Sequence, residues 1–140
     1  MSTLIVTAIS GWALVLAIAA TIALPYLLRR RALGAAERRP VLERLRPHYW
    51  LGYAIAGGAL VHAAVPAVAG WGLRANGTGL YLATGALLLV ILQMFWGLLL
   101  REPSVRDRAA VRRRHFWGMV GLVALALGHI ALNSALIHGL

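Results

Sequence analysis

Two similar stretches of the chain decide how it folds: HYWLGYAIAGGALVH, residues 48–62, and HFWGMVGLVALALGH, residues 115–129. Each begins with a histidine, an aromatic residue and a tryptophan, and each ends with a second histidine fourteen residues after the first. Fourteen residues of α-helix turn through about 1,400°, roughly 40° short of four full turns, so both histidines of a stretch lie near one helix face. They are about 21 Å apart along the axis, which is most of the hydrocarbon thickness of a bilayer. Two such helices facing each other present two pairs of imidazoles at two depths.

The composition indicates an integral membrane protein. The chain has 140 residues, of which 61% are hydrophobic and only 13% are charged. A soluble domain of this size could not bury so much apolar surface, so we expect the lipid bilayer to be its solvent. Cysteine is absent, which excludes disulfides, thiolate metal sites, iron–sulfur clusters and covalently attached haem.

The charge distribution predicts the orientation in the membrane. The formal net charge is +10, yet all fourteen basic residues are arginines and thirteen of them fall in two segments, residues 29–46 and 101–114. The four acidic residues lie in the same two segments. This is the positive-inside pattern of a multi-pass protein, here of a bacterial-type inner (plasma) membrane, and no nucleic-acid partner is expected.

The two basic segments and one short turn separate four apolar stretches, each long enough to span a bilayer. Pro25 is expected to bend the cytoplasmic end of the first span. We predict one all-α domain over residues 1–140, an up-down-up-down four-helix transmembrane bundle with both termini on the outer side. A short surface helix is expected within the first connection, between Ala32 and Arg46. The predicted spans cover residues 4–28, 48–70, 79–100 and 115–137, with cytoplasmic basic loops at 29–47 and 101–114.

In this topology the second and fourth spans run parallel, so His48 and His115 lie at the cytoplasmic edge while His62 and His129 lie nearer the outer side. A single intramembrane histidine can equally be an interhelical hydrogen-bond partner, but two pairs of one spacing favour metal ligands. Imidazole on each side of haem iron gives a six-coordinate centre suited to electron transfer. We therefore predict two non-covalent b-type haems. His138 falls on the opposite helix face from His129 and is not expected to be a ligand.

Small and basic residues beside these histidines extend the predicted sites. A porphyrin between helices needs close access, which Gly52, Gly58 and Gly118 are placed to provide. Gln93 is the strongly polar residue in the body of the third span, and an interhelical hydrogen bond is expected for it. The haem propionates need cations or hydrogen-bond donors at both membrane surfaces. At the inner haem we expect these from the arginines that adjoin the histidines, Arg44, Arg46 and Arg112 to Arg114, and above all from Arg46 and Arg114. At the outer haem the candidates are Arg74, Trp71 and Asn133.

The paired His-x13-His spacing on parallel helices resembles the haem-binding core of the cytochrome b superfamily. The two starts, His48-Tyr-Trp-Leu-Gly and His115-Phe-Trp-Gly, are also similar to the transmembrane haem domain of ferric reductases and NADPH oxidases, and Gln93-Met-Phe-Trp-Gly97 is similar to a cytochrome b helix that precedes a haem helix. The resemblance implies that His48 and His115 bind one haem and that His62 and His129 bind the other. No flavin or nicotinamide domain follows, so it also implies a membrane subunit that works with a separate redox protein on the cytoplasmic side, with quinone as a candidate acceptor.

Three functions remain open on the sequence. The first is a di-haem b-type cytochrome that moves electrons across the membrane. The second is a stand-alone ferric or quinone reductase that uses the outer haem. The third is a haem-free membrane assembly or transport protein, although the absence of acidic residues inside the spans argues against a proton-coupled transporter.

Overall fold

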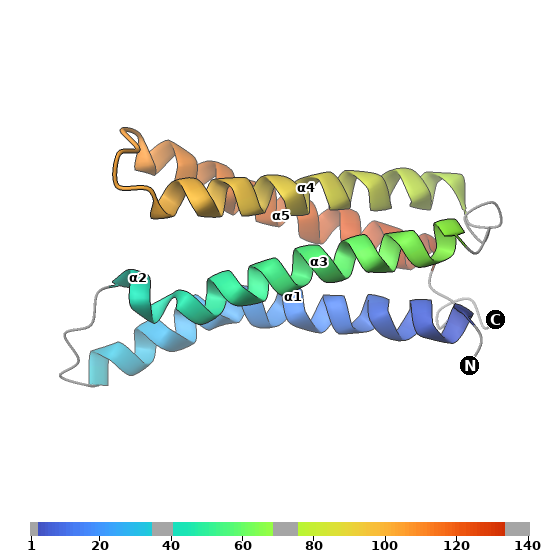
Figure 1. Cartoon of the computed structure of the whole chain (residues 1–140), viewed down its shortest axis with the longest axis horizontal. Coiled ribbons are helices and arrows are strands. Elements are labelled where there is room, and N and C mark those ends of the chain that lie inside the picture. Colours follow the sequence, from blue (N-terminus) through green and yellow to red (C-terminus); the bar gives the residue numbers. More distant parts are fainter. Residues whose placement is uncertain (1–2, 35–40, 69–75, 134–140) are drawn as a thin grey trace.

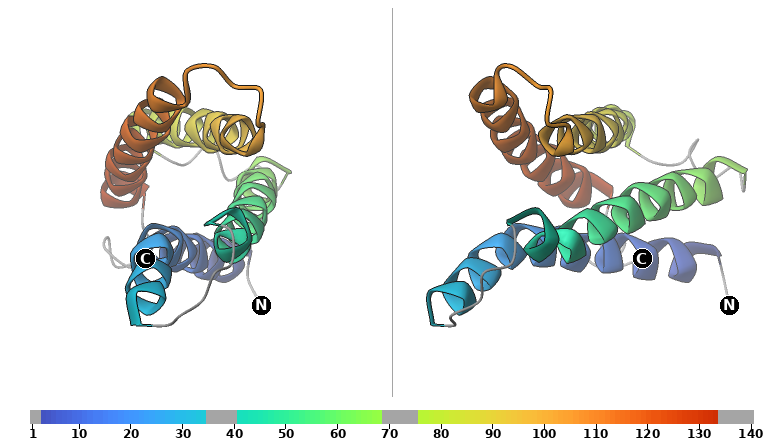
Figure 2. Two further views of the ribbon diagram at one scale, coloured as in Figure 1. Left: turned by 90° about the vertical axis from the view of Figure 1, so that its left-hand side faces the viewer. Right: turned by 60° about the vertical axis from the view of Figure 1, so that its left-hand side comes forward.

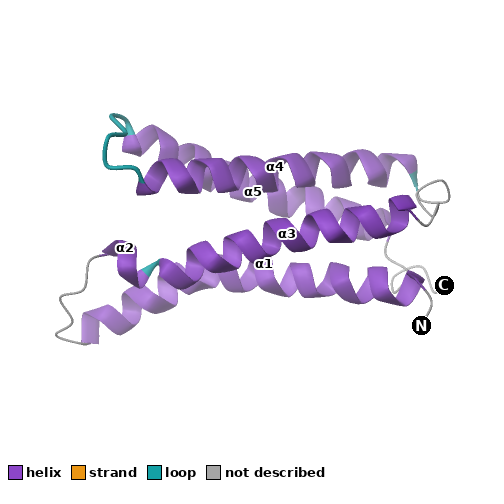
Figure 3. Ribbon diagram, viewed as in Figure 1, coloured by secondary structure: helices purple, strands orange, loops and turns teal. Residues whose placement is uncertain are grey.

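The computed structural model describes residues 3–34, 41–68 and 76–133 (Figure 1). Figure 3 shows that this described part consists of helices and connecting loops and contains no strand. The all-α class expected from the sequence is therefore confirmed. The helices are α1 (Thr3–Gly34), α2 (Val41–Arg44), α3 (Arg46–Val68), α4 (Gly77–Arg101) and α5 (Arg108–Asn133).

Four of the helices, α1, α3, α4 and α5, are long and apolar enough to cross a membrane. Large apolar side chains lie on the outside of the bundle; Leu16, for example, is 70% exposed and Phe95 is 54% exposed. Such a surface is suited to lipid rather than water. The chain is therefore a multi-pass membrane protein in contact with the bilayer. Its buried core is small and, within the described residues, consists of Ile55, Ala56, Val90, Val111 and Leu122.

The long helices form an up-down-up-down bundle. α1 and α4 run in one direction and α3 and α5 in the other (Figure 1), and an end-on view places α3 and α5 across from each other (Figure 2). α4 packs most extensively on α5 and α1 packs on α3, whereas α3 and α4 join these two hairpins through fewer contacts. We call the end where α3 and α5 begin the basic end, since it carries the arginine-rich segments, and the opposite end the far end.

Leucine side chains that pack against glycines hold each hairpin together. A Cβ atom on Gly85, Gly121 or Gly128 would approach a leucine of the facing helix to 3.1, 3.2 and 2.8 Å. In the other hairpin, a Cβ on Gly58 would lie 3.1 Å from the Leu14 side chain. Small residues allow membrane helices to approach closely where apolar burial alone gives little drive for association.

α5 begins at Arg108 rather than at residue 115, because two side chains close its first turn and the preceding connection. The Asp107 carboxylate accepts a hydrogen bond from the Ala110 amide at 2.8 Å, the geometry of a helix N-cap. The Arg108 guanidinium donates to the carbonyls of Leu100 at 3.4 Å and Glu102 at 2.7 Å, which satisfies the end of α4. The three-arginine run that the sequence suggested as loop is therefore helical.

The candidate membrane span of α1, Ile5–Leu28, agrees with the first predicted span at residues 4–28, while the helix itself continues through Pro25 to Gly34. Arginine is a good helix former, and a span can continue past the membrane surface without an apolar side chain. The short helix expected in the following connection is present as α2 and is only four residues long.

Candidate functional site

The four histidines of the sequence motif lie on α3 and α5. His48 is on the first turn of α3, and its imidazole meets that of His115 from α5, with ring centroids 6.4 Å apart and an interplanar angle of 74°. Two imidazoles that bind one metal ion from opposite sides, each nitrogen at about 2.0 Å, have ring centroids about 6 Å apart. The basic-end pair therefore has the separation that a bis-histidine site requires.

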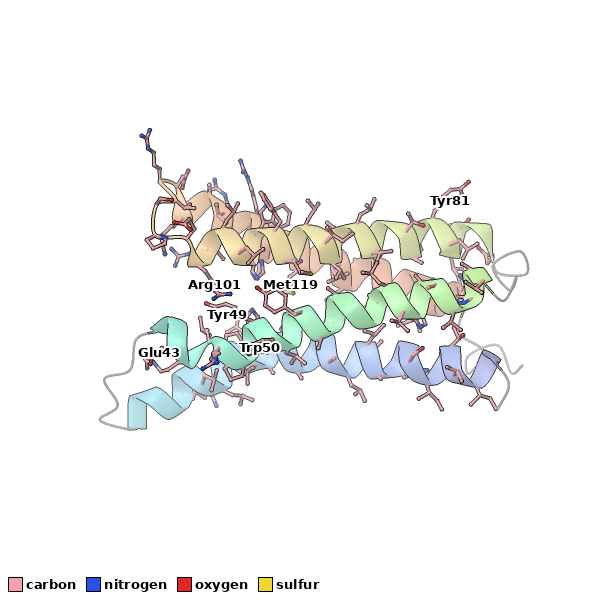
Figure 4. All side chains as sticks on the ribbon, viewed as in Figure 1. Glu43, Tyr49, Trp50, Tyr81, Arg101 and Met119 are labelled. Atoms are coloured by element: carbon pink, nitrogen blue, oxygen red, sulfur yellow. The ribbon has the colours of Figure 1, made fainter. Side chains whose placement is uncertain are left out.

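These two imidazoles line a cavity of about 470 Å³ between the hairpins. All four long helices contribute to its wall, which is mainly apolar and includes Ile18, Met94 and Met119. Figure 4 shows Met119, with Tyr49 and Arg101, in the space between α3 and α4. The volume falls in the range of pockets that hold small molecules and cofactors.

A hydrogen bond to α1 orients the imidazole ring of His48. Its Nδ1 lies 3.1 Å from the main-chain carbonyl oxygen of Thr21. A carbonyl can only accept, so Nδ1–H is the donor, and the neutral ring keeps its lone pair on Nε2. Thr21 can offer this oxygen because the residue four positions later is Pro25, which has no N–H to bond it within the helix. Pro25 thus supplies an acceptor for His48, a consequence beyond the bend expected from the sequence.

His62 is fixed by α1 in a similar way at the far end. Its Nδ1 lies 2.9 Å from the Ser10 hydroxyl oxygen, and that hydroxyl donates to the Thr7 carbonyl at 3.0 Å. The single Ser10 proton is therefore used within α1, so the serine oxygen accepts from Nδ1–H of the histidine. The backbone of Gly11 lies against the same ring, since a Cβ there would be 3.1 Å from Cε1.

His129 is fixed by α4. Its Nδ1 lies 2.9 Å from the Gly79 carbonyl oxygen and is again the donor. Asn133, expected to serve the outer haem, lies 3.4 Å from the same nitrogen through Nδ2. Its Oδ1 accepts a hydrogen bond from the Asn76 amide at 2.8 Å. Asn133 therefore joins the end of α5 to the start of α4.

The fourth histidine, His115, is close to Gln93 of α4. Gln93 Nε2 donates to the His115 main-chain carbonyl at 2.8 Å, which confirms the interhelical hydrogen bond predicted for this glutamine. Both His115 Nδ1 and Gln93 Oε1 are buried without a partner in the described part of the chain. Such atoms are uncommon and mark places that a ligand or a small rotation completes.

A common rule links the four contacts. The histidines of α3 are oriented by α1, and those of α5 face α4. Metal-binding histidines almost always donate their second ring N–H to a carbonyl, carboxylate or water, which fixes the ring and leaves the other nitrogen for the metal. His48 and His129 show this arrangement with a main-chain carbonyl, and His62 makes a similar contact with the Ser10 hydroxyl. α1 and α4 had no such role in the sequence interpretation.

The glycines expected beside a porphyrin have different neighbours. Gly52 lines the cavity, and a Cβ there would meet no atom within 4 Å. Gly97, on the α4 wall, is open in the same way. Gly58 instead receives a leucine of α1, and a Cβ on Gly118 would collide with Trp96 and approach Gln93 Nε2 to 2.8 Å. Gly118 therefore serves the α4–α5 contact.

The arginines on the cavity wall are Arg101 and Arg112. Arg46 lines a neighbouring hollow, and Arg114 is exposed and lines neither space. A role of Arg46 and Arg114 with the inner haem stays a prediction. Three further residues considered in the sequence, Trp71, Arg74 and His138, lie outside the described residues.

Within residues 3–34, 41–68 and 76–133, no group of three or more histidine, cysteine or acidic residues could hold a metal ion. His48 and His115 instead lie together as a pair, and two histidines are enough for a metal that brings its remaining ligands, as iron in a porphyrin does. Comparison with protein-family models, curated proteins and solved structures finds no match to this chain. The assignment of a chemistry to the site therefore rests on its geometry alone.

Proposed function

We propose that the chain is a membrane-embedded di-haem b-type cytochrome that moves electrons across the bilayer between a redox partner and an acceptor on the far side or a quinone. His48 and His115 would bind one haem at the basic end, and His62 and His129 the other at the far end. The observation that carries the proposal is the approach of His48 and His115, from two helices that are not adjacent in the bundle, to a centroid distance of 6.4 Å.

Contacts of the histidines support this assignment. The hydrogen bonds from Nδ1 of His48, His62 and His129 hold these rings and leave Nε2 as the free nitrogen. When bound, haem would supply a one-electron iron couple, and two histidine ligands would leave no position on the iron open to substrate. Arg112, on the cavity wall, can pair with a haem carboxylate.

The depth of the two pairs favours conduction across the membrane. Histidines fourteen residues apart on one helix are separated by about 21 Å, so the two sites together cover most of the hydrocarbon layer. The basic end also carries most of the arginines, which suits an acidic redox protein or domain as the electron partner. These features support a membrane subunit of a larger redox system.

Electron transfer through sealed vesicles tests the proposal. The purified chain is reconstituted with ferricyanide trapped inside, and a membrane-impermeant reductant is added outside. We expect the trapped ferricyanide to be reduced by the wild-type chain and by His138→Ala, but not by His48→Ala or His62→Ala, because each substitution interrupts the path. Equal rates for all four proteins would contradict the proposal.

The same preparation separates the two other functions. A chain that reduces ferric chelates or a quinone analogue at one surface, without transfer to the trapped acceptor, would be a stand-alone reductase. A folded, colourless chain from cells supplied with haem would be a haem-free assembly or transport protein.

A further inference from the structure

A second hollow, of about 530 Å³, lies beside the cavity at the basic end. Its lining residues come from three helices: Glu43 of α2, four residues of the first two turns of α3, and Arg101 at the end of α4. The candidate membrane span of α3 begins at Arg46, so the hollow lies at the level where a span enters the bilayer. Arg101 lines both spaces, whereas Glu43, Arg46 and Trp50 line only the hollow.

Arg101 is held in a fixed position on the wall of this hollow by neutral partners. Its guanidinium lies over the Tyr49 ring, 5.1 Å from the centroid, and donates to the Tyr53 hydroxyl at 3.4 Å. Figure 4 shows Arg101 directed towards Tyr49 across the space between α4 and α3. Neither tyrosine neutralises the guanidinium, so its charge remains available to an anion. Arg46 contributes a second guanidinium to the same hollow.

The remaining side chains restrict the kind of anion. Glu43 places a carboxylate on the wall, which disfavours a ligand that is only negative and favours one that also carries a cationic group. Trp50 and Tyr53 form an edge-to-face pair with centroids 6.1 Å apart, and Trp50 is 63% exposed. Exposed aromatic rings at this level are typical of the contact between a membrane protein and the lipid interface.

We propose that this hollow binds the headgroup of a zwitterionic phospholipid with a primary ammonium group, a phosphatidylethanolamine. Arg46 and Arg101 pair with the phosphate, Glu43 with the ammonium, and the glycerol end of the lipid contacts Trp50. The two guanidiniums complement the negative phosphate, and the carboxylate complements the positive ammonium. The exposed aromatic pair favours an amphipathic ligand over free phosphate.

Native mass spectrometry of the full chain, released from detergent after purification, tests this site. Arg46→Gln is compared with Arg114→Gln, which removes the same charge from an exposed position outside the hollow. We expect the wild type and Arg114→Gln to retain about one phosphatidylethanolamine, and Arg46→Gln to lower retention roughly tenfold. Equal retention by Arg46→Gln and Arg114→Gln would overturn the proposal.

Two further measurements identify the ligand. Glu43→Gln should shift retention from phosphatidylethanolamine towards phosphatidylglycerol in an equimolar mixture, because the ammonium loses its carboxylate partner. An unchanged ratio would overturn the assignment of Glu43. Millimolar inorganic phosphate should not displace the lipid, and complete displacement would identify a free-phosphate site instead. Haem content is measured in parallel, so a failure of the cytochrome proposal is seen separately from a failure of the lipid site.

Discussion

At the basic end, His48 and His115 face each other across a cavity that all four long helices line, whereas at the far end the ring of His62 lies against the backbone of Gly11. The hairpins are also further apart at the basic end, where α3 and α4 diverge (Figure 1). The same sequence pattern thus lies in an open setting at one end and a close-packed one at the other. The comparison indicates that equal histidine spacing does not give equal packing, because the neighbouring helix determines how accessible each ring is.

The largest expected effect is the loss of one haem from one end. His48→Ala should remove the basic-end haem and His62→Ala the far-end haem, because each removes one axial nitrogen. The expected haem content is therefore one per chain for either variant and two for the wild type and His138→Ala, measured by pyridine haemochrome absorbance against protein concentration. Loss of both haems in a correctly folded single variant would show that the two ends are not independent.

Methyl groups at Gly11 and Gly57 test the packing against His62. The Cβ of Gly11→Ala would lie 3.1 Å from His62, so the ring must move, whereas the Cβ of Gly57→Ala meets no atom within 4 Å. Overpacking of this kind costs about 1–3 kcal/mol, so Gly11→Ala should lower far-end haem occupancy about fivefold or more. Gly57→Ala, at an exposed position outside the cavity, should leave both haems in place. The opposite order of effects, measured by haem content and low-spin electron paramagnetic resonance signals, would contradict the packing described for His62.

Pro25→Ala tests the acceptor for His48. An alanine restores an N–H that can bond the Thr21 carbonyl within α1, and this bond competes with the His48 contact. A histidine N–H bond raises ligand basicity and so favours oxidised iron. One hydrogen bond is worth about 0.5–1.5 kcal/mol, so its weakening should raise the basic-end midpoint potential by about 20–60 mV. A redox titration measures this, and a shift confined to the far-end haem would refute the link.

Ser10→Ala is the equivalent test at the far end, with the smallest expected change. It removes the oxygen that accepts from His62, while the backbone of Gly11 still holds the ring. The far-end potential should rise by about 20 mV or less, the lower end of the range for one hydrogen bond, and Ser10→Thr, which keeps the hydroxyl, should restore it. If Ser10→Thr and Ser10→Ala behave alike, the hydroxyl does not orient the histidine.

Much of the fold could be predicted from the sequence because the membrane imposes it. Apolar length identified the four spans, and short connections placed α3 and α5 in parallel, so His48 and His115 were expected at the same end. The helix ends were less predictable, since the arginines after residue 28 and before residue 115 are polar yet helical. Asp107, one residue before α5, was a local N-cap signal that the sequence interpretation did not use.

The contacts that orient the histidines were not predictable in the same way. Ser10 could be interpreted only as a residue that bonds back to its own helix, as it also does. Its second contact, with His62, depends on the rotation and register of α1 against α3, which local spacing does not determine. Pro25 could be identified in the sequence as a residue that leaves the Thr21 carbonyl without its helical hydrogen bond. That this carbonyl accepts from His48 depends on the position of α3 relative to α1. Arg101 was overlooked because it ends a span rather than adjoining a histidine.

The central claim is that paired histidines make two haem sites in one bundle, and the most direct test is the haem stoichiometry of the wild-type chain. A reduced-minus-oxidised absorption spectrum of the detergent-purified protein, grown with ample haem, is combined with quantitation of haem and protein. The account predicts two non-covalent b-type haems per chain with bis-histidine, low-spin spectra. A folded chain without haem, or with one haem that survives both His48→Ala and His62→Ala, would contradict it.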